Sequence, residues 1–176
     1  MLAILPMLTR GASLPGDMMN TITVRTIEKR DIPEVVTLLR KHARYHEQIE
    51  PEHFVSNQTE SIWLGYISRY GDSENARIVV AFDGSKVIGL MASRIEAQHS
   101  ILSKLPTIGM ITRAFVEEGY RKQGVSRLLL GATIQWFKEH SIEFVQIGSL
   151  EGNEDGTRTW EYLGFRMYSH KLELRI

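Results

Sequence analysis

The chain has 176 residues, 43% of them hydrophobic and 24% charged, which is enough for one domain with a substantial core. Its 21 basic and 21 acidic residues give a net charge of +0, so composition gives no reason to expect a nucleic-acid or membrane partner. Cysteine is absent, which excludes a disulfide framework, a thiol nucleophile and a cysteine zinc site, and which fits a cytoplasmic protein.

The first 20 residues differ from the rest of the sequence. Residues 1–8 are apolar but too few to span a bilayer, and no charged segment precedes them as in a secretory signal. Prolines and glycines disfavour a helix here. We expect a flexible leader over residues 1–20, with Met18 or Met19 as the usual start, and a single domain over residues 21–176. An organelle-targeting role is the alternative, because the leader has an arginine and almost no acid.

Apolar periodicity predicts five elements in the first half of the domain. Asp31, Pro33 and Glu34 mark a helix start, because Asp can cap a helix, proline is tolerated in the first turn and glutamate there favours the dipole. Pro51 ends any continuation of that helix. The elements are a strand at 22–27, a helix that begins at Asp31, a helix at 61–70, and strands at 78–82 and 86–95 joined by a hairpin turn.

The second half is expected to begin with a central strand at 107–116, which is hydrophobic on both faces. A deeply packed helix at 125–140, a buried strand at 144–147 and a short helix at 157–163 follow. Residues 165–168 open a last pair of strands, and Leu172 and Leu174 alternate with charged residues in a half-buried strand at 171–176. The element order is β-αα-βββ-α-β-α-β, an α/β fold (α+β by some schemes).

A small basic loop at 117–126 lies between the central strand and the packed helix. The first turn of a helix leaves backbone N–H groups without partners, and its dipole favours negative charge. Gly124 lets the backbone approach an anion, and Arg121 and Lys122 add positive charge. The loop therefore predicts a phosphate or pyrophosphate site, although a plain turn with surface basic residues is the alternative. It lacks the residues of a Walker loop and of a dinucleotide fingerprint.

Arg121-x-x-Gly124-x-Ser126 resembles the acyl-CoA signature of the GNAT N-acyltransferase superfamily, Arg/Gln-x-x-Gly-x-Gly/Ala. In that family the signature follows a strand ending in Val and then an aromatic residue, and Val116 and Tyr120 fall in those places. Ser126 replaces the usual Gly or Ala. The predicted element order also matches the GNAT fold from residue 22 onwards, which is a single central mixed, mostly antiparallel sheet flanked by helices.

A second segment of the family pattern follows the strand at 144–147. Asn153, Gly164 and Phe165 match it, whereas Gly156 stands where Ala is usual and Trp160 where Tyr is usual. The family Tyr often protonates the leaving thiolate, which indole cannot do near neutral pH. We interpret Trp160 as an apolar wall beside the pantetheine arm, and core packing is the alternative. Core packing is also the favoured interpretation of Tyr162, which two helical steps place on the opposite face.

The resemblance implies acetyl-CoA as the cosubstrate. Its pyrophosphate would lie on the loop, and its pantetheine arm would enter a gap between the strands at 107–116 and 144–147. The expected cofactor-binding residues are Ala114, Phe115, Val116, Arg121, Lys122, Gln123, Gly124, Val125, Ser126, Asn153 and Trp160.

The implied reaction is direct transfer of the acetyl group to an amine, which must be neutral to attack, so a base is expected. Thr112 stands where many relatives carry a glutamate base. Glu96 and Glu47 are the remaining candidates, and a solvated surface role is the alternative for both. Tyr45 and His46 lie in the segment that often lines the acceptor site in this family.

A zinc-protease motif near these residues fails, because Glu50 stands where the second histidine must be, and we expect no metal site. The function that fits is an N-acetyltransferase acting on a small-molecule or peptide amine. A non-catalytic acyl-CoA sensor and, less well, a nucleotide- or phosphate-binding protein are the alternatives. Dimers are common in the family, so a homodimer is one possibility that no feature of the sequence reports.

Overall fold

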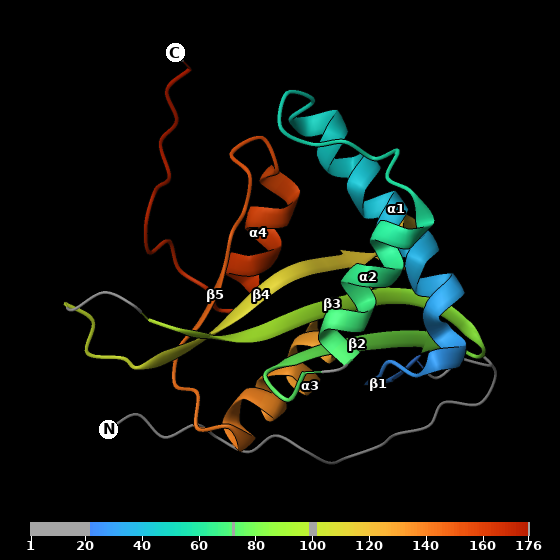
Figure 1. The fold of residues 1–176 in the computed structure, drawn as a ribbon, viewed down its shortest axis with the longest axis horizontal. Coiled ribbons are helices and arrows are strands. Elements are labelled where there is room, and N and C mark those ends of the chain that lie inside the picture. Colours follow the sequence, from blue (N-terminus) through green and yellow to red (C-terminus); the bar gives the residue numbers. More distant parts are fainter. Residues whose placement is uncertain (1–21, 72, 99–101, 176) are drawn as a thin grey trace.

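The computed structural model describes residues 22–71, 73–98 and 102–175, so the leader expected at residues 1–20 lies outside the described residues. Figure 1 shows a twisted sheet with helices on both faces. Its elements are β1 (Ile22–Thr26), α1 (Ile32–Ile49), α2 (Glu60–Gly71), β2 (Ala76–Asp83), β3 (Lys86–Ala97), β4 (Thr107–Val116), α3 (Val125–Glu139), β5 (Val145–Ile147) and α4 (Glu154–Tyr162). Short 3-10 turns, Lys29–Asp31 and Glu118–Tyr120, precede α1 and α3.

The sheet has the order β1-β2-β3-β4-β5, which follows the order of the strands in the sequence. Every neighbouring pair is antiparallel except β4 and β5, which run parallel. The expected α/β fold with a mixed, mostly antiparallel sheet is therefore confirmed.

Two apolar clusters hold the helices to the sheet. Residues of α1 and α2 pack against one face, where Leu39 and Trp63 meet Val80 and Leu90. Helix α3 covers the other face, as Figure 1 shows, with Leu129, Trp136 and Phe137 fully buried. The strands at the centre are thus buried on both faces, which explains their nearly continuous apolar sequences.

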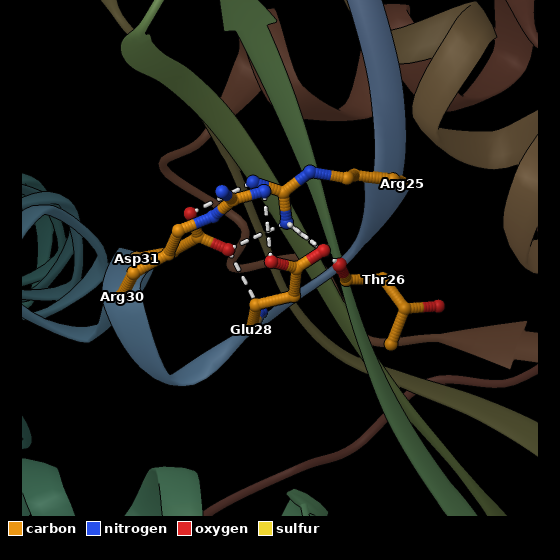
Figure 2. Close-up of polar contacts among 5 residues, drawn as sticks. All are labelled: Arg25, Thr26, Glu28, Arg30 and Asp31. Atoms are coloured by element: carbon orange, nitrogen blue, oxygen red, sulfur yellow. Dashed lines mark hydrogen bonds and ion pairs between the residues drawn. The ribbon is translucent and has the colours of Figure 1, made fainter.

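Asp31 ties the end of β1 to the start of α1, but not by the capping bond that the sequence predicts (Figure 2). Its carboxylate accepts hydrogen bonds from both terminal nitrogens of Arg25, at 2.6 and 2.9 Å, and from the backbone N–H of Glu28 at 2.7 Å. The side chain makes no capping bond to α1. Asp31 is 6% exposed, and its hydrogen bond with Arg25 is the main cause that lowers the pKa of the carboxyl group.

The end of the chain differs from the prediction. Residues 163–175 contain no strand, and Leu172 and Leu174 are 92% and 83% exposed, so the half-buried strand expected at 171–176 is wrong over the described residues. Phe144, expected in a buried strand, precedes β5 and is 51% exposed. Alternating residues give a segment two unlike faces, but a strand also needs a partner edge. Here exposed ion pairs join the segment to the rest of the described chain. Glu173 contacts His53 at 2.7 Å, and Arg175 contacts Glu52 at 3.2 Å.

Candidate active site

The loop before α3 presents a row of free backbone donors. The N–H of Arg121 bonds to Glu118, and that of Arg127 bonds to Gly124 at 3.0 Å. Between them, the N–H groups of residues 122–126 donate to no acceptor among the described residues. Lys122 and Gly124 have φ angles of 60° and 82°, which turn successive N–H groups toward one side. A Cβ on Gly124 would meet no described atom within 4 Å, so the space above the loop is open.

Tyr120 and Arg121 of this loop contact residues of other elements. Tyr120 donates a hydrogen bond to Asp83 at 2.8 Å, which fixes the loop to the β2–β3 hairpin and raises the pKa of the tyrosine. The guanidinium of Arg121 lies 5.5 Å from the ring centre of Tyr45 and 5.8 Å from that of Phe115. The loop therefore has fixed ends and a charged side chain stacked beside its open donors.

Strands β4 and β5 diverge toward the end of β4 that leads into the loop. They pair only over Gly109–Ile111 and Val145–Ile147, whereas β4 continues to Val116. A cavity of about 620 Å³ lies along the part of β4 that β5 does not pair with, and it reaches the loop, α1 and α4. Of the residues expected to bind cofactor or acceptor, the cavity is lined by Tyr45, His46, Ala114, Phe115, Val116, Arg121, Lys122, Gly124, Val125, Ser126, Asn153 and Trp160.

Asn153 connects the two helices on either side of the cavity. Its side-chain oxygen accepts hydrogen bonds from the N–H of Gly156 at 3.0 Å, which caps α4, and from the hydroxyl of Tyr45 at 2.8 Å. A Cβ at Gly156 would overlap the Asn153 side-chain amide in its present position, so Gly156 lets this amide lie close against the first turn of α4. Trp160 is partly buried, with its ring edge-to-face against Phe165 at 5.5 Å. Tyr162 is 76% exposed, so core packing, the favoured interpretation, was wrong.

Two histidines of α1 share one face of the helix, as their spacing predicts. The ring centres of His42 and His46 lie 4.2 Å apart, and His42 meets the ring of Phe115 at 5.8 Å while His46 meets that of Phe54 at 5.0 Å. Burial is the main cause that lowers the pKa of His42 to about 3, with His46 and Arg113 adding to it. Burial and then Arg113 also lower the pKa of His46. Both imidazoles are therefore neutral at pH 7.

The three other candidates do not line the cavity. Glu96 accepts a hydrogen bond from Arg94 at 2.6 Å, Glu47 accepts one from Ser56, and the side chain of Gln123 donates to the Gly119 carbonyl at 2.8 Å.

Thr112 stands where the family resemblance implies a glutamate base, and its hydroxyl is already hydrogen-bonded. At a β-bulge of β4, its hydroxyl donates to the Ala92 carbonyl at 3.2 Å and is hydrogen-bonded to the hydroxyls of Tyr66 and Tyr70. Asp155 supplies the one carboxylate among the described lining residues. His42 lines the cavity although it was not among the expected site residues, and its i, i+4 spacing from His46 is the signal that could have included it.

Comparisons with known proteins identify the family of this chain. The profile of the family described as Acetyltransferase (GNAT) matches residues 40–165. An N-alpha-acetyltransferase of Sulfurisphaera tokodaii is 30% identical over 105 residues, which is 57% of this chain and 62% of that protein. The match thus spans less than two thirds of that relative.

Solved structures share the fold at low sequence identity. An aminoglycoside N-acetyltransferase in complex with CoA has a TM-score of 0.73 at 15% identity, covering 93% of this chain and 99% of that one. A BH1408 protein variant from Bacillus halodurans has a TM-score of 0.76 at 20% identity, covering 88% and 99%. An aminoglycoside 6′-N-acetyltransferase from Acinetobacter haemolyticus has a TM-score of 0.72 at 14% identity, covering 88% and 97%. With its profile match over most of the sequence, the chain belongs to the acetyltransferase (GNAT) family.

Proposed function

We propose that this protein transfers an acetyl group from acetyl-CoA directly to a primary amine. The observation that carries the proposal is the row of free N–H groups at residues 122–126, next to a cavity along the part of β4 that β5 does not pair with. Such a row at a helix N-terminus binds phosphate oxygens, and the adjoining cavity suits a long, narrow arm.

The residues that line the cavity suit the parts of acetyl-CoA. The diphosphate would accept hydrogen bonds from the loop and lie beside Arg121 and Lys122. The pantetheine arm would run along Ala114, Phe115 and Val116, where no β5 residue uses the main-chain groups, with Trp160 as an apolar wall. Acetyl-CoA supplies the activated acyl group as a thioester.

The transfer requires a neutral amine within reach of that thioester. Its nitrogen bonds to the acyl carbon, the carbon–sulfur bond breaks, the nitrogen loses one proton to water, and the amide product retains the acetyl group. The indole of Trp160 is no acid for the leaving sulfur, but a thiol has a pKa of about 8.5, so the thiolate leaves without one and takes its proton from water.

The acceptors named for the relatives differ. The relative from Sulfurisphaera tokodaii is named an N-alpha-acetyltransferase, and several solved neighbours are named for aminoglycosides. These names all refer to acetylation of an amine nitrogen, so we propose a small-molecule or peptide amine as the acceptor.

A loop variant tests the cofactor assignment. Gly124→Glu places a carboxylate among the free N–H groups, and we expect acetyl-CoA binding, measured by calorimetry, to fall at least about tenfold. Gly131→Glu is the matched control, because this glycine of α3 is exposed and has open space around it, so the charge change is the same. Circular dichroism checks that both variants fold. Unchanged affinity in the folded Gly124→Glu variant would contradict the assignment.

Turnover tests the reaction itself. Release of free CoA thiol with at least one member of an amine panel supports transfer. Tight binding of acetyl-CoA without release from any amine would instead favour the non-catalytic sensor. Displacement of acetyl-CoA by ATP would favour the nucleotide-binding alternative.

A further inference from the structure

We propose that the acceptor amine is the α-amine of an amino acid or peptide, placed against His42 and His46, and not an alkylamine or a polycationic aminoglycoside. This inference rests on the proposed acetyl transfer. It is based on the charged residues that line the cavity and on the shortage of carboxylates among them.

The cavity has almost no negative charge for a polycation. Its described lining includes Arg121, Lys122, Arg127 and Arg158 against the single carboxylate of Asp155. An aminoglycoside carries several ammonium groups, and each one that leaves water needs a partner. Phosphate groups of the cofactor would neutralise basic residues, but they add no carboxylate for the acceptor.

The two base candidates, Glu47 and Glu96, and two acids just after α1 already have partners. Glu47 accepts a hydrogen bond from Ser56, and Glu50 lies 3.6 Å from His53. Glu52 pairs with Arg175 and Glu96 with Arg94, and none of these four carboxylates lines the cavity.

Imidazoles take the place of a carboxylate at this end. His42 and His46 lie on the cavity side of α1, and the described residues provide no hydrogen-bond partner for either ring. The groups that face them are Tyr45 on α1, Phe54 after it, and Phe115 and Arg113 on β4. Burial, and after it the positive charge of Arg113, lowers the pKa of both rings, so they accept hydrogen bonds from an amine but bind a proton weakly.

Such a site suits an amine that loses its proton easily. A peptide α-amine has a pKa of about 8 and an alkylamine one of about 10.4, so at pH 7 the neutral fraction of the α-amine is roughly 200-fold larger. The neutral α-amine attacks the thioester, the nitrogen–carbon bond forms and the carbon–sulfur bond breaks. The proton that the nitrogen then loses passes to water, and the thiolate is protonated by solvent.

Two forms of one lysine-containing peptide test the choice. One has a free α-amine and an acetylated side chain, and the other has an acetylated α-amine and a free side chain. From CoA thiol release at pH 7, we expect kcat/KM to be at least about tenfold higher for the first form, and higher than for kanamycin or spermidine. Equal or better use of the second form or of kanamycin would overturn the inference. No release from any amine would instead count against the proposed function.

A charge variant tests the cause of the selectivity. His46→Glu adds a carboxylate at the acceptor end, so we expect the ratio of kcat/KM values to shift at least about fivefold toward the lysine side chain. His46→Gln is the control, because it removes the imidazole without adding charge and should not favour the side chain. An unchanged ratio in a folded His46→Glu variant that binds acetyl-CoA would contradict the argument from missing carboxylates.

Discussion

Asn153 shows how one side chain joins local structure to the site. Its oxygen caps α4 and accepts the hydroxyl of Tyr45, so the same residue fixes the start of one helix and the position of another. Tyr45 in turn lies beside Arg121 of the loop. The family motif predicts Asn153 at this place, but its contacts with Tyr45 and Gly156 join residues far apart in the sequence and appear only in the folded chain.

Gly156→Ala separates helix propensity from this contact. Alanine favours a helix over glycine by about 0.8–1 kcal/mol, yet its Cβ would meet the Asn153 amide at 2.4 Å and displace it. We expect a net loss of about 1 kcal/mol in the free energy of unfolding, measured with urea, because a cap and a side-chain hydrogen bond are lost. Acetyl-CoA binding should weaken as well.

Gly65→Ala is the matched control. Gly65 lies in α2, is exposed and has open space around it, so alanine there should stabilise the protein. A Gly156→Ala variant as stable as Gly65→Ala would show that the cap tolerates the methyl group.

Among the elements, helices and strands with a clear apolar period were predictable within a few residues up to α4. Each carries its own signal, such as Pro33 at the start of α1 or the apolar run of β4. The sequence wrongly predicted a strand at 171–176, because an alternating pattern does not say which strand edge, if any, will pair with the segment. The convergence of His42 with Phe115 likewise depends on how α1 crosses the sheet.

The connection from β1 to α1 gives a pH-dependent prediction. The pKa of Asp31 is lowered in the folded protein, so its carboxylate stabilises the fold above the usual pKa of about 3.9, and this stability is lost as the pH falls through the lower, folded value. Urea unfolding should show Asp31→Asn to be less stable than wild type at pH 7. The difference should shrink once the pH is below the folded pKa.

Glu28→Gln serves as the comparison for Asp31→Asn. Glu28 is a half-exposed member of the same network, at 3.6 Å from Arg25, and an exposed ion pair contributes about 0–1 kcal/mol. An equal loss in both variants, or a difference between Asp31→Asn and wild type that does not depend on pH, would contradict the role given to Asp31.

At the scale of the whole molecule, both faces of the sheet are covered, whereas β5 pairs with only part of the neighbouring strand β4. Helices cover both faces, but β4 and β5 pair over a short stretch, and the cavity occupies the place where they separate. No helix of the described part of the chain is both long and apolar enough to cross a membrane. The loop before α3 and the two histidines thus lie on different elements, and α1 links them, because it carries His42 and His46 and its Tyr45 lies beside Arg121 of the loop.

The last residues of the chain lie outside this packed body. All described residues after Phe165 are exposed, and the ion pairs Glu173–His53 and Arg175–Glu52 join side chains at the surface. We expect deletion of residues 166–176 to lower the free energy of unfolding by no more than about 1 kcal/mol, because such pairs contribute little. Deletion from residue 165 should cost more, since Phe165 packs against Trp160. A loss of several kcal/mol on removing 166–176 would mean that the segment is packed in solution, and light scattering would tell pairing within one chain from pairing with a second copy.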